Sequence, residues 1–136
     1  MIDQTITISG LVATTPRHLE TADGLEITSF RVASGTQKYD RATNTYRDGE
    51  TNWYTITAFR SLAVNAKNSI SKGDRIIVSG KLRVRDWDNG ERSGTSVEIE
   101  ANLIGHDLSF GTSKFERVVF SKDPEPVSAS VDLTAE

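Results

Sequence analysis

Two strand patterns separated by one short helical segment constrain the fold of this chain more than any other feature of its sequence. Residues 51–60 read TNWYTITAFR and residues 74–87 read DRIIVSGKLRVRDW, and both alternate apolar and polar positions as half-buried strands do. Between them lies a helical stripe formed by Leu62, Ala63, Ala66 and Ile70. We expect Ser61 to cap this helix and Lys72-Gly73 to end it.

The two strand patterns predict a surface that combines aromatic and basic side chains. In residues 74–87 the alternation predicts one inward, apolar face, made of Ile76, Val78, Gly80, Leu82 and Val84. The opposite face carries Lys81, Arg83 and Arg85 and ends at Trp87. In residues 51–60, Trp53 and Phe59 share their face with two threonines, which favours the solvated side of the sheet.

Such a face has two interpretations. Exposed aromatic rings beside cations form a platform for a flat, anionic ligand, and single-stranded nucleic acid fits that description. Alternatively, exposed aromatics cover a neighbouring subunit or partner, and a basic outer face protects a solvated strand. The combination favours nucleic acid, with a protein-interaction module as the alternative.

The remaining strand patterns complete an all-β chain. Residues 5–15, 25–35 and 95–105 alternate in the same way, and the last of these should turn inward Val97, Ile99, Ala101 and Leu103. Residues 36–50 are polar and form either a long loop or an extended β-ribbon. Three strands, one helix and two strands is the order of an OB-fold, a five-stranded Greek-key barrel, although another small barrel would also fit.

The chain divides into three parts. We expect an OB-fold domain over residues 1–107 and an extra C-terminal strand over 108–120, outside the barrel, whose phenylalanines another subunit could cover. Residues 121–136 are polar and acidic, and we expect them to be disordered. This tail carries the whole net charge of −3, so a binding face must be locally positive on a neutral body.

The sequence offers little for catalysis. There is no cysteine, and the two histidines, His18 and His106, lie far apart and are expected on the surface or in loops rather than as ligands. We find no acid–base pair of carboxylates and expect no enzyme activity, metal or cofactor. The N-terminus lacks the pattern of a secretory signal, so we expect a cytoplasmic, nucleoid-associated protein that contacts no membrane.

Three motifs give the chain a family resemblance. They are FRVASG at residues 30–35, TNWYTITAF at 51–59 and SKGDRIIVSGKLRVRDW at 71–87. With them the chain resembles the bacterial single-stranded DNA-binding proteins over about residues 4–118. The last motif is the most specific of the three, because it combines a strand, G-x-L-x-x-R-x-W and a hairpin in that order.

The resemblance implies a homotetramer, or a pair of dimers, that binds single-stranded DNA without sequence preference and protects it during replication, recombination and repair. Position by position, it implies stacking by Trp53, Phe59 and Trp87, with Tyr39 the nearest match to a further aromatic. It implies phosphate contacts by Lys81, Arg83 and Arg85, and further candidates are Arg31, Arg60 and Lys72.

The C-terminus departs from the family pattern. Family members usually end in a glycine-rich linker and an acidic tip closing on Pro-Phe, which docks partner enzymes. This chain ends VDLTAE, as expected of a specialised paralogue or of a truncated chain. The resemblance therefore does not extend to tail-mediated docking of repair and replication proteins.

Overall fold

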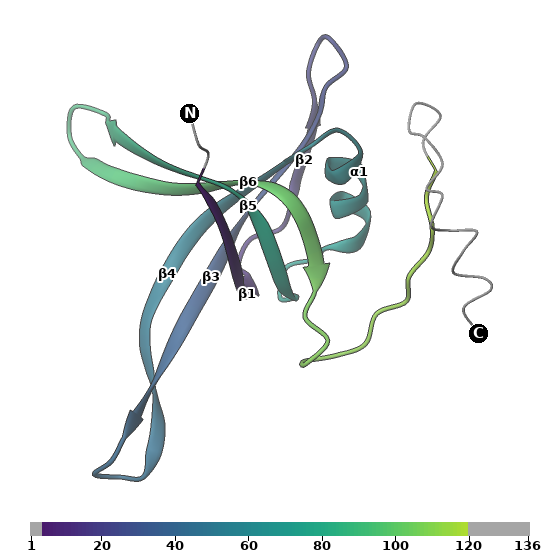
Figure 1. The fold of residues 1–136 in the computed structure, drawn as a ribbon. Helices are drawn as coiled ribbons and strands as arrows, with labels where there is room; N and C mark the ends of the chain where they lie inside the picture. Colours follow the sequence, from purple (N-terminus) through teal and green to yellow (C-terminus); the bar gives the residue numbers. More distant parts are fainter. Residues whose placement is uncertain (1–3, 120–136) are drawn as a thin grey trace.

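The computed structural model describes residues 4–119, apart from the side chains of residues 36–38 and 48. In this range the chain forms six strands and one helix (Figure 1). In chain order they are β1 (Thr5–Val12), β2 (Arg17–Glu20), β3 (Glu26–Asp40), β4 (Thr45–Phe59), α1 (Arg60–Ser69), β5 (Arg75–Asp88) and β6 (Ser93–His106).

The strands close into a five-stranded barrel. Neighbouring strands follow the order β1-β5-β6-β4-β3, and the end of β1 also pairs with β3, at Leu11↔Ala33 and Val12↔Val32. The pairing of β4 with β6 is parallel, and all other pairings are antiparallel. With α1 between β4 and β5, this is the predicted OB-fold order.

The barrel interior is filled by the apolar face of each strand. The buried cluster includes Ile8, Val12, Phe30, Val32, Ile56, Ile76, Val78 and Ile99. Gly10 allows β1 to pass close to β3, because a Cβ at this position would lie 2.6 Å from the Ala33 carbonyl oxygen. The expected inward positions of the first half of β5 are confirmed, since Ile76 and Val78 are fully buried.

A β-bulge in β6 changes which of its residues face inward. Ser79 pairs with Leu103 but Gly80 pairs with Ala101, so Asn102 is the extra residue. Beyond the bulge the alternation is inverted: Ile104 packs against the core, while Leu103 is 68% exposed. The prediction that Leu103 faces inward was therefore wrong.

The far part of the β5–β6 hairpin extends beyond the barrel, and this explains why the predicted inward position of Val84 was wrong. Val84 pairs with Val97, beyond the β6 residues 98–100 that pair with β4. In Figure 1 this part of the hairpin projects away from the barrel. No layer covers it there, so Val84 is 63% exposed rather than inward.

The polar segment between β3 and β4 forms a ribbon, the second of its two predicted alternatives. Pairing continues as far as Asp40↔Thr45, and Asn44 takes a left-handed conformation with φ of 59°. Figure 1 shows this β3–β4 hairpin projecting from the barrel as a second arm.

The helix begins differently from the prediction. Phe59 occupies the N-cap position without a side-chain hydrogen bond, and Arg60, with φ of 61°, already belongs to α1. Ser61 therefore lies inside the first turn and is not the cap. The helix ends at Ser69, before Lys72-Gly73, and its predicted stripe packs inward through Ala63 and Ala66. No helix in residues 4–119 is long and apolar enough to cross a membrane.

The short strand β2 was not predicted, since it lies between the strand patterns at residues 5–15 and 25–35. It pairs with β3 from Arg17↔Ser29 to Glu20↔Glu26 and continues the sheet at that edge. In the turn that follows, Thr21 accepts a hydrogen bond from the Leu25 amide and donates one to Asp23. The bond from Thr21 holds the pKa of Asp23 below its usual value.

The segment after β6 contains no strand within the described residues 107–119 of this single chain, and the expected extra C-terminal strand over residues 108–120 stays a prediction. A strand needs a hydrogen-bonded neighbour, and this segment runs away from the barrel in Figure 1. Its apolar side chains are exposed, Phe115 to 87%. A role as subunit clamp stays a prediction. Phe120 and the expected disordered tail, 121–136, lie outside the described residues.

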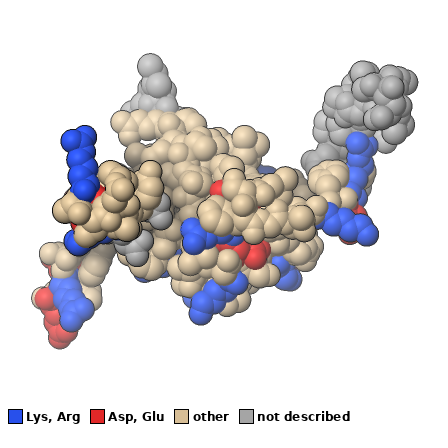
Figure 2. All heavy atoms as spheres, turned by 90° about the horizontal axis from the view of Figure 1, so that it is seen from below, with Lys and Arg blue, Asp and Glu red and all other residues tan. Residues whose placement is uncertain are grey.

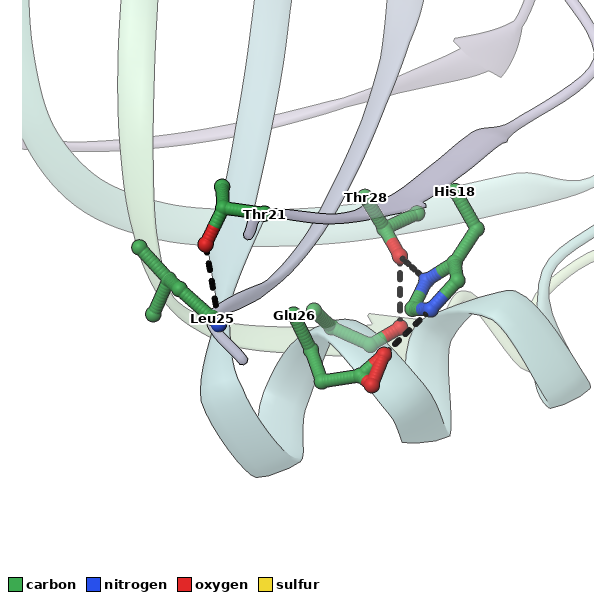
Figure 3. A network of polar contacts seen from close by, with 6 residues as sticks. His18, Thr21, Leu25, Glu26 and Thr28 are labelled. Carbon is green, nitrogen blue, oxygen red and sulfur yellow. Dashed lines mark hydrogen bonds and ion pairs between the residues drawn. The ribbon is translucent and has the colours of Figure 1, made fainter. Parts of the chain in front are cut away.

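A polar network joins the helix to the barrel (Figure 3). The Thr28 hydroxyl is fully buried and donates to the Ala63 carbonyl of α1 at 2.7 Å. Because its proton is engaged there, it accepts a hydrogen bond from His18 Nδ1 at 2.8 Å. His18 Nε2 in turn contacts a Glu26 carboxylate oxygen at 2.7 Å.

We expect Thr28→Val to lower the free energy of unfolding by about 1–3 kcal/mol, because the buried Ala63 carbonyl and the His18 ring would each lose a partner. Urea unfolding followed by circular dichroism measures the change. Thr51→Val, at an exposed position of β4, is the matched control and should change stability little. Equal effects of the two substitutions would contradict a role for the network.

Candidate nucleic-acid interface

The outer face of β4 carries the aromatic row that the sequence predicts. Ile56 and Ala58 are buried, so the alternate residues Trp53, Thr55, Thr57 and Phe59 point outward. Trp53 is 47% exposed, and Phe59, at the end of the strand, is half-buried. The two rings thus lie on one side of one strand, and at least the indole is accessible.

Arg31 lies beside Trp53 on the neighbouring strand β3. Its guanidinium carbon is 4.9 Å from the centroid of the indole ring, within the range of a cation–π contact. Ala33 stands opposite Trp53 in the register and leaves room for this arrangement. A base that stacks on Trp53 would therefore take the other ring face or replace the guanidinium.

The cations of β5 lie on the solvated face of the strand, Lys81 and Arg83 on the barrel and Arg85 where the hairpin has begun to leave it. Ile76 and Val78 are buried, which places Lys81, Arg83 and Arg85 on the opposite side of the strand. Arg83 and Arg85 are exposed, and Lys81 is half-buried. The predicted basic row is thus present.

The strand β6 lies between this basic row and the aromatic row, and it contributes two acidic residues that the sequence prediction missed. Glu98 stands opposite Arg83, and Glu100 stands opposite Lys81. Glu98 also approaches Arg85, with 3.8 Å between carboxylate oxygen and guanidinium nitrogen. The alternation V-E-I-E-A at residues 97–101 could have placed both carboxylates on the solvated face.

Trp87 sits on the projecting part of the β5–β6 hairpin. It pairs with Gly94, and a Cβ added to Gly94 would lie 2.9 Å from the indole. The ring therefore packs directly against the backbone of β6 and remains 42% exposed. An open hollow beside it is lined by Asp86, Trp87, Asp88, Ser93, Gly94 and Thr95.

The β3–β4 arm carries a pair of tyrosines. Tyr39 stands opposite Tyr46, and their rings meet edge to face with centroids 5.2 Å apart. Both are exposed, Tyr46 more than Tyr39. Tyr46 was not among the predicted site residues, although its position opposite Tyr39 makes it an equally good candidate for base stacking. Arg47 pairs with Asp40 at 3.0 Å in the same arm.

Two predicted cations lie off these rows. Arg60 is the first residue of α1, and Lys72 lies in the turn before β5; both are exposed. Strand alternation assigns neither of them to the aromatic face. On the side of the molecule shown in Figure 2, Lys and Arg side chains are spread over several places rather than joined in one patch.

The histidines are placed differently from the expectation of surface or loop positions. His18 lies in β2 and His106 ends β6, and both are partly buried. His106 contacts Asp74 at 3.1 Å and Ser113 at 2.6 Å. Among the residues that the structure describes, no group of three or more His, Asp or Glu side chains is arranged to hold a metal ion.

Comparison with known proteins gives consistent matches. The model of the single-strand binding protein family matches residues 3–107. Single-stranded DNA-binding protein 2 of Tropheryma whipplei (strain Twist) is 53% identical over 112 residues, which are 82% of this chain and 74% of that protein. Single-stranded DNA-binding protein 1 of Streptomyces coelicolor is 44% identical over 108 residues, covering 79% and 69%.

Solved structures show the same fold. The small single-stranded DNA-binding protein of Streptomyces coelicolor superposes with a TM-score of 0.75 at 40% identity, over 82% of this chain and all of that one. The second single-stranded DNA-binding protein of Mycobacterium smegmatis gives a TM-score of 0.65 at 28% identity, over 85% of this chain and all of that one.

Proposed function

Because the chain belongs to the single-strand binding protein family, we propose that it binds single-stranded DNA without sequence preference. The observation that carries the proposal is the exposed aromatic side chains, Trp53 on the barrel and Trp87 on the hairpin arm, beside the cations of β5. Stacking tolerates any sequence because every base has a π-face. Phosphate contacts by Lys and Arg add a term that is also blind to sequence and weakens with salt.

The roles of individual residues are part of this proposal. Trp53, Phe59 and Trp87 stack bases, and the Tyr39–Tyr46 pair extends the surface along the β3–β4 arm. Arg83 and Arg85 contact phosphates, as does Lys81. The position of Arg31 over the Trp53 ring supports a stacking contact for it as well as a phosphate contact.

The cellular role follows from the ligand. A protein that covers exposed single strands protects them during replication, recombination and repair, and acts by binding, without catalysis. We place this role in the cytoplasm, on the nucleoid.

A titration of intrinsic tryptophan fluorescence with a dT oligomer tests the proposal, with a duplex of equal length as control. Strong quenching by dT and little by duplex is expected, because the bases of a duplex are not available to stack. Absence of quenching at low salt would remove the DNA proposal and favour a face that binds a protein partner instead.

We further propose that the chain assembles as a homotetramer or a pair of dimers, with residues 108–120 clamping one subunit to another. The exposed Leu108, Phe110 and Phe115 support this, since isolated chains rarely leave so many large apolar side chains of one short segment in solvent.

Deletion of residues 108–136 is expected to lower the oligomer mass or to weaken the assembly by at least about tenfold in concentration, measured by sedimentation velocity. Deletion of residues 121–136 alone keeps the apolar segment and serves as the control, which should sediment as the full assembly. An unchanged assembly after the longer deletion would exclude the clamp.

A further inference from the structure

The acidic residues of β6 occupy the centre of the proposed DNA-binding face. The strand order β5-β6-β4 places β6 between the cations of β5 and the aromatic row of β4. On the β4 side, Thr55 pairs with Glu98 and Thr57 pairs with Glu100. A nucleic-acid strand that touches both rows must therefore cross the two carboxylates.

These carboxylates also face the cations themselves. Residues directly opposite each other in an antiparallel pair have their Cβ atoms about 4.5–5.5 Å apart. The register gives this relation to Lys81 with Glu100 and to Arg83 with Glu98. Arg85 adds a 3.8 Å contact to Glu98, whose side chain is only 26% exposed. Each cation of the basic row thus has a negative charge as its neighbour.

We propose that Glu98 and Glu100, the carboxylate row, limit the contribution of phosphate contacts, so that DNA is held mainly by base stacking. The proposal rests on the proposed function. A phosphate that approaches the basic row meets three cations that two carboxylates partly neutralise, and these carboxylates repel it. Bases that stack on Trp53 or Trp87 are uncharged and do not meet this repulsion.

The carboxylate row also acts on selectivity. Duplex DNA offers phosphates at about one charge per 1.7 Å of its axis but no free base faces, so its binding depends on the cations alone. Partial neutralisation of those cations weakens the interaction on which a duplex depends, whereas a single strand retains its stacking energy. The carboxylate row therefore lowers the affinity for duplex DNA more than the affinity for single strands.

The test is a salt titration of the double variant Glu98→Gln/Glu100→Gln, with a dT oligomer and a duplex as probes. Each additional phosphate of a single strand that the protein neutralises steepens the slope of log affinity against log salt by about 0.7. We expect the variant to neutralise about two more phosphates than the natural chain. Raising the salt from about 50 to 200 mM would then reduce the dT affinity of the variant by a factor about sevenfold larger than that of the natural chain. At low salt it should bind duplex more tightly, by a larger factor than it binds dT.

The control variant, Glu20→Gln/Glu125→Gln, removes the same charge at Glu20, an exposed residue of β2, and at Glu125, which follows the proposed clamp segment in the sequence. Its salt slope should equal that of the natural chain. Equal slopes for both variants and the natural chain would overturn the proposal, and equal steepening in both variants would assign the effect to net charge instead. Each single substitution is measured too, so that a variant that unfolds does not decide the result. Failure of the natural chain to bind dT at all would instead refute the proposed function.

Discussion

Replacing Trp53 with alanine is expected to weaken binding of a dT oligomer by about 5- to 150-fold per binding site. This factor corresponds to about 1–3 kcal/mol for one base stacked on an aromatic ring. The ring is 47% exposed and lies on the outer face of the barrel, so its loss removes stacking surface without opening the core. Equilibrium titration at fixed salt, followed by the remaining fluorescence of Trp87 or by a labelled oligomer, measures the change.

Two controls separate stacking from other effects. Trp53→Phe keeps a ring and should retain most of the affinity, and thermal unfolding of both variants should match that of the natural chain. The salt slope should stay the same in Trp53→Ala, because no phosphate contact is removed. Full affinity in Trp53→Ala would mean that the aromatic row of β4 is not the binding surface.

A second large effect is expected at Gly80, where the backbones of β5 and β6 approach each other beside the bulge. A Cβ at Gly80 would lie 2.1 Å from the Glu100 carbonyl oxygen and 2.8 Å from Ala101 Cα. Both neighbours are backbone atoms of a paired strand and cannot rotate away. We expect Gly80→Ala to lower the free energy of unfolding by about 3 kcal/mol, the upper range for overpacking.

Gly105→Ala is the matched control for this substitution. Gly105 lies in the same pair of strands, opposite Ile77, and a Cβ there meets nothing within 4 Å. Chemical denaturation of both variants should show a shifted midpoint for Gly80→Ala and a small change for Gly105→Ala. A stable Gly80→Ala variant would mean that the strands can separate at the bulge without loss.

The strand patterns and their order were enough to predict the barrel. Alternation also predicted that Trp53 is exposed to solvent, since an inward Ile56 fixes an outward Trp53. It failed at Leu103, because a bulge adds one residue without leaving a mark in the sequence. The inward position predicted for Val84 was also wrong, because alternation does not show where a hairpin extends beyond the barrel and its residues lose their packing partners.

The content of the candidate site was predicted less completely than the barrel. Glu98 and Glu100 are readable as outward residues, but their importance depends on the parallel pairing of β6 with β4, which joins distant parts of the chain. The strand β2 has only four residues, and its pairing comes from the turn that brings it to β3. Sequence alternation therefore reveals neither the long-range pairing of β4 with β6 nor a strand as short as β2.

The closure of the barrel sets an order of events for a chain emerging from the ribosome. β3 and β4 can pair as soon as both have been made, but β1 finds its main partner in β5, where Thr7 bonds to Ser79 across 72 residues of sequence. Contacts between such distant residues form late and slow the folding of a chain. During synthesis, the edge of β1 that pairs with β5 therefore stays unpaired until β5 has left the exit tunnel, and in this interval the nascent chain is most exposed to pairing with another strand.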